Sequence, residues 1–312
     1  MHRARVVFMV VAVVSAPAVV PAQPQERHDE SFKIANWNVR SGMGIAAKKN
    51  ARIDSNTTDC TMNASKPGGP FWPALRAVKD DREVIALGVQ EAWACATPEK
   101  MRAYLDWRQA TPERNGTGLI TKYGMRGKHV VEQIAFKGVE GANEDQWLFG
   151  GDVCMDGDCR TTVRVYSAHF TAADDAGFTA QARNTMAYVT SQPSADRNIV
   201  LGDLNYFMAN RTFVKCGTTR TTSPPADVFA NAGYVDAWKA LKPDVDGATG
   251  MYNRPGCGSP EGGLFKRIDY IYTRGYKPTD VRLFATIKPM EEDAPSDHAG
   301  IIATLRDEGR HN

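Results

Sequence analysis

Side chains suited to acid–base or metal chemistry stand at the ends of short apolar runs along this chain. They are acids, amides and histidines, and the set comprises Asn38, Glu91, His169, Asp203, Asn205, Asp269, Asp297 and His298. Of the six histidines in the sequence, only His169 and His298 adjoin apolar runs beside acids. A histidine has a free pKa of about 6.5, which suits proton transfer near neutral pH. The pattern indicates a site for proton transfer or metal binding.

Each member of this set also has an ordinary structural explanation. The Gly-Asp-Leu-Asn segment at 202–205, for example, is a common turn, because Asp and Asn bond their own backbone. The carboxylates taken together are harder to explain in this way. If Glu91 and the three aspartates of the set converge, they cannot all stay ionised without a cation nearby. Oxygen ligands favour hard ions such as Mg²⁺, Mn²⁺ or Ca²⁺ over Zn²⁺.

Strands are needed to hold these residues in place. Residues 32–38 alternate apolar and polar side chains, as in a half-buried strand, and residues 84–89 are continuously apolar, as in a strand buried on both faces. Further strands are expected at 117–122, 130–136, 163–170, 198–201, 268–272, 281–287 and 300–305. Helices are expected over 71–82, after the cap and proline at 97–98, over 179–191, and in a shorter stretch of 227–241. Two sheets packed face to face with helices outside fit this pattern.

The order of the polar residues resembles the endonuclease/exonuclease/phosphatase superfamily. The matching elements are an Asn, Gln-Glu, a His, Gly-Asp-x-Asn, Ile-Asp-Tyr and Ser-Asp-His, at residues 38, 90–91, 169, 202–205, 268–270 and 296–298. The resemblance implies an α/β domain over residues 32–306, a four-layer sandwich of two packed mixed β-sheets flanked by helices. It also implies hydrolysis of a phosphate ester with a divalent cation, usually Mg²⁺.

The resemblance further implies roles for single residues. Glu91 corresponds to the principal metal ligand, with Asn38 and Asp297 as helpers. His298 corresponds to the general base that takes a proton from the attacking water. Asp269 corresponds to the carboxylate that orients this histidine and stabilises its charged form.

Four more residues complete the implied site. Asp203 would hold the water or a metal, and Asn205 would donate a hydrogen bond to the phosphoryl oxygens. His169 corresponds to a second histidine of the deoxyribonuclease and sphingomyelinase branches, where it can contact the phosphate or protonate the leaving oxygen. Glu132 stands where the deoxyribonuclease branch has a glutamate that supports this histidine, although a solvated strand acid explains it equally well.

The substrate is less sharply defined by the sequence. Cys216 and Cys257 match cysteine positions of pancreatic-type deoxyribonucleases, which favours a deoxyribonuclease-like endonuclease. Residues 92–94, after Glu91, lack the arginine that this branch inserts into the minor groove. A sphingomyelinase-type lipid phosphodiesterase, a small-molecule phosphatase and an inactive binding module are the alternatives. The expected partner is a phosphodiester substrate, with nucleic acid as the candidate, and no protein partner is indicated.

The first 22 residues have the features of a secretory signal: a basic start, an apolar run over 6–14 and small-residue cleavage patterns. A membrane anchor is the alternative, but the run is short for the roughly 20 residues of a span. We therefore expect a signal peptide at 1–22, a polar leader at 23–31 and a polar tail at 307–312. The mature protein would be secreted or periplasmic, without stable membrane insertion.

Charge and cysteines agree with this expectation. The formal charge of +2 comes from 38 Lys and Arg against 36 Asp and Glu, and removing Arg3 and Arg5 with the signal brings it to zero. A nucleic-acid binder that relies on a strong overall positive field is thereby excluded.

The six cysteines form an even set, as in exported proteins. The turn at 156–157 favours a Cys154–Cys159 disulfide over a metal loop, and chain order suggests Cys60–Cys95 and Cys216–Cys257.

Overall fold

The structure is a computed structural model of the 312-residue chain. It describes residues 31–42, 60, 64–112, 116–133, 147–171, 175–193, 196–206, 224–245, 247–252, 264–286 and 294–309. All of them belong to one unit, Ser31–Asn312. The expected signal peptide, most of the leader, half of the tail and the Cys216–Cys257 pair lie outside the described residues, so these stay predictions.

The first sheet has six strands in the order β13-β14-β1-β2-β4-β3. β1 pairs with β2 in parallel, and every other pair in the sheet is antiparallel. The strands are β1 (Ser31–Asn38), β2 (Val84–Gln90), β3 (Gln109–Ala110), β4 (Gly118–Thr121), β13 (Tyr276–Phe284) and β14 (Gly300–Asp307).

The second sheet also has six strands, in the order β5-β6-β7-β8-β12-β9, and only β7 and β8 run parallel. Its strands are β5 (Met125–Gln133), β6 (Trp147–Cys154), β7 (Thr162–His169), β8 (Asn198–Asp203), β9 (Val235–Asp236) and β12 (Asp269–Arg274). A separate pair is formed by β10 (Gly250–Tyr252) and β11 (Leu264–Lys266).

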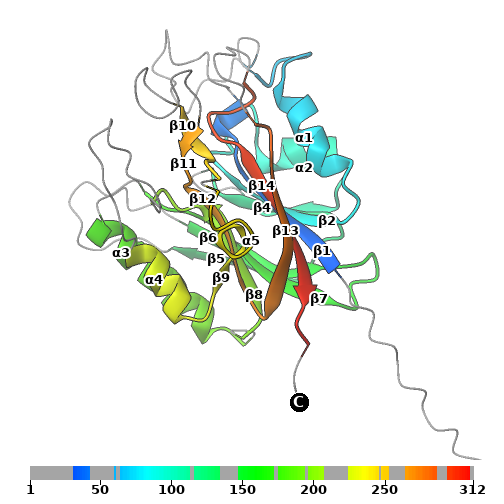
Figure 1. Ribbon diagram of the computed structural model, residues 1–312. Coiled ribbons are helices and arrows are strands. Elements are labelled where there is room, and N and C mark those ends of the chain that lie inside the picture. The colour runs from blue at the N-terminus through cyan, green and yellow to red at the C-terminus, as the bar shows by residue number, and fades with distance from the viewer. Residues whose placement is uncertain are drawn as a thin grey trace, which may run out of the picture. The chain divides into compact units, whose positions relative to one another are not determined.

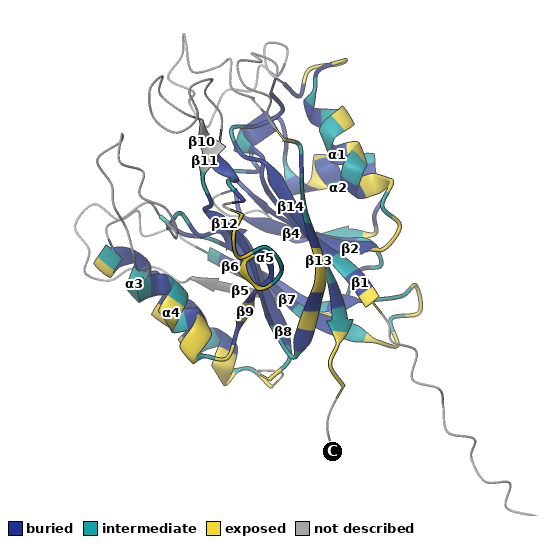
Figure 2. Ribbon diagram, viewed as in Figure 1, coloured by how far each residue is buried: buried dark blue, intermediate teal, exposed yellow. Residues whose placement is uncertain are grey.

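Helices cover the outer faces of both sheets (Figure 1). On the first sheet lie α1 (Phe71–Lys79) and α2 (Pro98–Leu105), and on the second lie α3 (Asp175–Ser191) and α4 (Pro224–Asn231). The short helices η1 (Arg40–Gly42) and α5 (Ala237–Leu241) complete the set of described helices. Three apolar cores separate the four layers, and Figure 2 shows the strands buried between helices whose outer faces are exposed. The expected four-layer sandwich with two mixed sheets is confirmed.

The alternation of β1 explains how polar residues reach the space between the sheets. Ile34 belongs to the core between the sheets, whereas Ala35 and Trp37 pack under α1 and α2. Because successive side chains of a strand point to opposite faces, Asn36 and Asn38 continue the face of Ile34. The inward face of β1 is therefore apolar at its start and polar at its end.

Some elements differ from their expected limits. β6 is absent from the sequence-based strands because Gly150 and Gly151 interrupt its apolar pattern. β5 and β13 begin five residues earlier than expected, and the register of β13 shifts between Pro278 and Asp280. The helical stretch expected within 227–241 is two helices, α4 and α5, with β9 between them. At α2 the Thr97 side chain accepts a hydrogen bond from Lys100 N, as the cap predicts.

Two of the three expected disulfides fall within the described residues, and both are present: Cys60–Cys95 and Cys154–Cys159. The second joins the end of β6 to the loop before β7, at the turn that the sequence indicates. Among the helices that the structure describes, none has the length and apolar character to cross a bilayer.

Candidate active site

The carboxyl ends of two parallel strand pairs meet at one end of the sandwich. Asn38 of β1 lies opposite Gln90 of β2, and His169 of β7 lies opposite Asp203 of β8. The Asn38 side chain joins the two sheets, because its Nδ2 donates to Glu91 Oε1 at 3.0 Å and to Asp203 Oδ2 at 2.8 Å. Its Oδ1 accepts from the backbone N of Arg40 at 3.0 Å. One buried amide thus fixes a carboxylate from each sheet.

Glu91 is held in an unusual backbone conformation directly after β2. Its φ is +49°, a left-handed value that costs a residue with a side chain of the order of 1 kcal/mol or more. The Glu91 carbonyl accepts from Ser41 N at 2.7 Å and from Ser41 Oγ at 3.3 Å. Gly116 packs behind it, and a Cβ there would lie 2.3 Å from the Trp93 ring and 2.8 Å from Glu91 Cα. These contacts direct the half-buried carboxylate toward the site.

His298 and Asp269 form a buried pair from the two sheets. His298 Nδ1 lies 2.8 Å from Asp269 Oδ2, and Asp269 Oδ1 accepts from Asn36 Nδ2 at 3.3 Å. Trp37 Nε1 donates to the His298 carbonyl at 3.0 Å, so the backbone of the histidine is also fixed. Because Nδ1 faces Asp269, Nε2 points into the site, 3.7 Å from Asp203 Oδ2.

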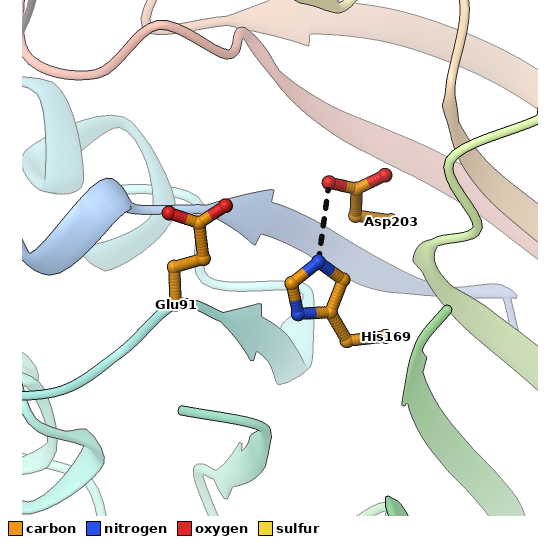
Figure 3. A group of neighbouring side chains, drawn as sticks. All are labelled: Glu91, His169 and Asp203. Carbon is orange, nitrogen blue, oxygen red and sulfur yellow. Dashed lines mark ion pairs between the residues drawn. The ribbon is translucent and has the colours of Figure 1, made fainter. Parts of the chain in front are cut away.

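His169 and Asn205 also lie close to Asp203. His169 Nε2 lies 3.6 Å from Asp203 Oδ2, and Figure 3 shows this ring directed at the carboxylate with Glu91 facing both. Asn205 Nδ2 donates to Phe170 O at 2.7 Å and lies 3.3 Å from His169 Nε2. One of its two amide hydrogens is therefore committed to the backbone, and the other faces the histidine.

Burial and crowding shift two pKa values in this cluster. Burial, and then the charge of Asp269, raise the pKa of Asp203 to about 6. Burial alone would lower the pKa of His298, but the carboxylates of Asp269 and Asp203 outweigh it and raise that pKa to about 10. The carboxylates of the cluster are therefore buried without enough surrounding donors or water to stabilise all of their negative charge.

Among the residues that the structure describes, two overlapping groups of side chains could hold a metal ion, and Asp203 belongs to both. One is Glu91 with His169 and Asp203, and the other is Asp203 with Asp269 and His298. In each group the ligand atoms lie within 4.8 Å of one another. Carboxylate oxygens dominate the donor set, and the raised pKa of Asp203 records uncompensated negative charge. A hard divalent cation fits such a site.

Asp297, expected as a helper ligand, lies outside both of these groups. Its Oδ2 lies 3.5 Å from Arg40 Nε, and its Oδ1 lies 4.0 Å from His298 Nε2. Asn38 turns its donor nitrogen, not its oxygen, toward the carboxylates. Glu132 lies in β5 opposite Leu148 of β6, but its side chain is outside what the structure describes. The structure thus gathers Glu91, His169, Asp203, Asp269 and His298 most closely.

A buried polar chain behind the site was not anticipated. Gln90 Nε2 donates to Asn36 Oδ1 at 2.9 Å and to Ser167 Oγ at 3.1 Å, and Asn36 in turn reaches Asp269. These side chains are fully buried between the sheets. The one available signal was the alternation of β1, which places Asn36 on the same face as Asn38.

We expect the stability of the cation-free protein to fall as the pH rises from about 6.5 toward 10. Since the pKa of His298 is raised in the folded state, the native protein binds more protons than the unfolded chain in this window, and ΔG of unfolding declines with pH. Melting temperatures in EDTA at pH 7 and pH 9 would measure it. His298→Asn should show a smaller decline than wild type, and equal declines would contradict the charged pair.

Comparisons with solved structures show the same fold in several proteins. An endonuclease/exonuclease/phosphatase from Beutenbergia cavernae aligns with a TM-score of 0.59 at 15% identity, over 89% of this chain and 72% of that one. A protein of that family from Bacteroides thetaiotaomicron aligns with a TM-score of 0.60 at 14% identity, over 90% and 99% of the two chains. D. rerio TDP2, complexed with a single-strand DNA product, gives 0.58 at 14% identity, over 89% and 99%.

Sequence comparison decides the family. No curated protein matches the chain significantly. The profile described as "Endonuclease/Exonuclease/phosphatase family" matches residues 35–298, a span that runs from β1 to His298 and contains every residue of the cluster. Members of this family are hydrolases that act on phosphate esters. With the fold, the strand ends and the profile in agreement, the chain belongs to the endonuclease/exonuclease/phosphatase family.

Proposed function

We propose that this protein is a divalent-metal-dependent phosphodiesterase, a deoxyribonuclease-like endonuclease that acts outside the cytoplasm. The observation that carries the proposal is the His298–Asp269 pair, whose remaining ring nitrogen faces Asp203 inside a carboxylate cluster. This arrangement has the parts of a hydrolytic site: a base, its orienting carboxylate and a second carboxylate near the reacting water.

In this proposal His298 Nε2 takes the proton of the attacking water. Asp269 holds the ring through Nδ1 and stabilises the imidazolium that forms. Asp203 Oδ2, 3.7 Å from Nε2, would hold the water by accepting its second hydrogen. Asn36 keeps Asp269 in place from behind, so the base is oriented by a chain of buried groups.

His169 and Asn205 would act on the phosphate. His169 would donate from its ring to a phosphoryl oxygen or to the leaving oxygen, and the Asn205 amide, 3.3 Å from His169 Nε2, would donate to the phosphate. Donors aimed at the developing negative charge lower the barrier of phosphoryl transfer.

A divalent cation bound by Glu91 and Asp203 would polarise the phosphate and offset the negative charge that raises the pKa of His298. A base must be neutral before it can accept a proton, and at pH 7 a pKa of about 10 leaves His298 charged. Because Asp269 and then Asp203 raise this pKa, we expect activity to require a cation that offsets their negative charge, in addition to His298 as the base. The identity of the cation, Mg²⁺ or alternatively Mn²⁺ or Ca²⁺, belongs to the proposal.

The choice of nucleic acid as substrate rests on the structural comparison with TDP2 bound to a DNA product and on the cysteine positions. The choice of an extracellular or periplasmic site rests on the two disulfides and the N-terminal signal features. A sphingomyelinase-type activity, a small-molecule phosphatase and an inactive binding module are the competing functions.

The test is metal-dependent turnover on a small substrate panel. Purified protein would be incubated with plasmid DNA, RNA, sphingomyelin vesicles and bis(p-nitrophenyl) phosphate, each with Mg²⁺, Mn²⁺, Ca²⁺ or EDTA. We expect nicking of plasmid DNA with a divalent cation and none in EDTA. Turnover of sphingomyelin alone would replace the nuclease by the lipid phosphodiesterase. Turnover of none of the four would favour the binding module.

A further inference from the structure

β12 carries a buried tyrosine next to the aspartate that orients His298. Asp269 and Ile271 face the space between the sheets, whereas Tyr270 and Tyr272 face the core under α3 and α4. The Tyr270 ring is fully buried, stacks on Tyr206 at 4.7 Å, and has the Arg267 guanidinium 4.6 Å from its centroid. A hydroxyl buried this deeply needs hydrogen-bond partners.

The Tyr270 hydroxyl finds those partners in the backbone of two site-bearing segments. It lies 3.0 Å from Tyr206 O and 2.9 Å from Arg267 O, within donating distance of both carbonyls. Tyr206 directly follows Asn205, and Arg267 stands two residues before Asp269. One hydroxyl therefore bridges the loop of Asn205 and the strand entry that leads to Asp269.

Asn205 is a residue that needs to be held. Its φ is +55°, a left-handed value that persists only when the surroundings fix it. Its side chain makes the 3.3 Å contact with His169 and the 2.7 Å bond to Phe170 O, so a small rotation of the backbone would move the amide away from both. On the carboxyl side of Asn205, the backbone of Tyr206 is held at both ends: its N donates to Leu204 O at 2.6 Å, and its O accepts from the Tyr270 hydroxyl.

Tyr272 provides an internal comparison. It lies in the same strand, faces the same core, is 2% exposed and stacks on Tyr270 with ring centroids 5.5 Å apart. Its hydroxyl, however, pairs with the Tyr206 hydroxyl at 2.7 Å. Removing that hydroxyl would cost a similar buried hydrogen bond but would leave Tyr206 O and Arg267 O with their partner.

We propose that Tyr270 is a positioning residue of the active site, whose hydroxyl fixes Asn205 relative to Asp269. The proposal rests on the proposed function for its kinetic consequence, but its structural content concerns the Asn205 loop alone. Loss of the hydroxyl should displace the Asn205 amide and leave Glu91 and the substrate-binding surroundings unchanged. The substitution should therefore lower kcat more than it changes KM.

The experiment compares Tyr270→Phe with Tyr272→Phe in the full chain. With bis(p-nitrophenyl) phosphate and Mg²⁺, Tyr270→Phe should lower kcat between about 10-fold and 100-fold, because displacement of a positioned group by 1 Å can cost about 100-fold. KM should change by less than about 2-fold, as for a group that acts after binding. Tyr272→Phe should keep wild-type kcat, while both variants, which retain their rings, should fold and show similar melting temperatures.

A second readout does not depend on activity. In ¹⁵N-labelled protein the side-chain amide signal of Asn205, assigned by its loss in Asn205→Ala, should shift in Tyr270→Phe and stay in place in Tyr272→Phe. An unmoved signal, or equal loss of kcat in both variants, would overturn the positioning role. If wild type itself hydrolyses nothing, the proposed function fails, and the amide signal still decides whether Tyr270 holds Asn205.

Discussion

Replacement of His298 by alanine should lower kcat by about 1,000-fold, near the middle of the range for loss of a general base. The imidazole is the group whose Nε2 faces Asp203 while Nδ1 is fixed by Asp269, and alanine offers no atom that could take a proton. Single-turnover rates on bis(p-nitrophenyl) phosphate with saturating Mg²⁺ would measure the chemical step. The melting temperature should also fall, because Asp269 is left buried without its partner.

Asp269→Asn separates a base from a merely structural histidine. If Asp269 acts through His298, a variant that carries both Asp269→Asn and His298→Ala should be no slower than His298→Ala alone. The effects of residues that act as a unit do not add, because the first substitution already removes their shared contribution. Titration calorimetry should show that His298→Ala still binds Mg²⁺, since Glu91 and Asp203 remain. A folded His298→Ala variant with near-wild-type turnover would remove His298 from the role of base.

The second large effect is expected from Glu91→Gln. The change keeps the size of the side chain and the hydrogen bond from Asn38 but removes the negative charge that a divalent cation requires. Changes that only support a metal ligand already cost about 10-fold to 100-fold in affinity, so loss of this carboxylate should weaken Mg²⁺ binding by at least about 100-fold. Calorimetry and the Mg²⁺ concentration for half-maximal activity would both report it.

Glu99→Gln is the matched control. Glu99 is the exposed acid of the first turn of α2 and pairs with Arg102 at 2.8 Å, away from the strand ends. The same chemical change there should leave Mg²⁺ affinity and turnover at wild-type values. If Glu91→Gln binds Mg²⁺ as tightly as this control does, Glu91 is not the principal ligand and the cation is held by Asp203 with Asp269.

The positions of the site residues could be predicted because each stands where an apolar run ends. β1, β2 and β8 have strong strand patterns, so Asn38, Glu91 and Asp203 could be assigned to strand ends with little ambiguity. The order of the polar residues along the chain carried the family resemblance, and that resemblance implied the four-layer arrangement of two sheets and flanking helices. The strand pattern fitted two packed sheets, but the family resemblance was needed to specify the four-layer fold.

The contacts between these residues could not be predicted, because they depend on how two sheets pack. Asn36 and Asp269 are 233 residues apart and meet only through the alignment of β1 with β12. The left-handed backbone conformation of Glu91 could not be predicted from the sequence either. Its sequence neighbours are ordinary, and the conformation depends on contacts with Ser41 and Gly116. The Tyr270 hydroxyl was likewise indistinguishable from any core aromatic until its two carbonyl partners were placed.

The order of strands in the first sheet has a consequence for when activity can arise during synthesis. β1, the first strand of the domain to be synthesised, lies between β2 and β14. Its second edge is therefore paired only when β14, the last strand, is available. His298 lies two residues before the start of β14. A chain still leaving the ribosome or a translocation channel therefore lacks both the strand that pairs with the second edge of β1 and the proposed base, His298. If the proposed activity and export are correct, hydrolysis begins only after β14 has emerged, which would confine the nuclease to the side of the membrane where its chain is released.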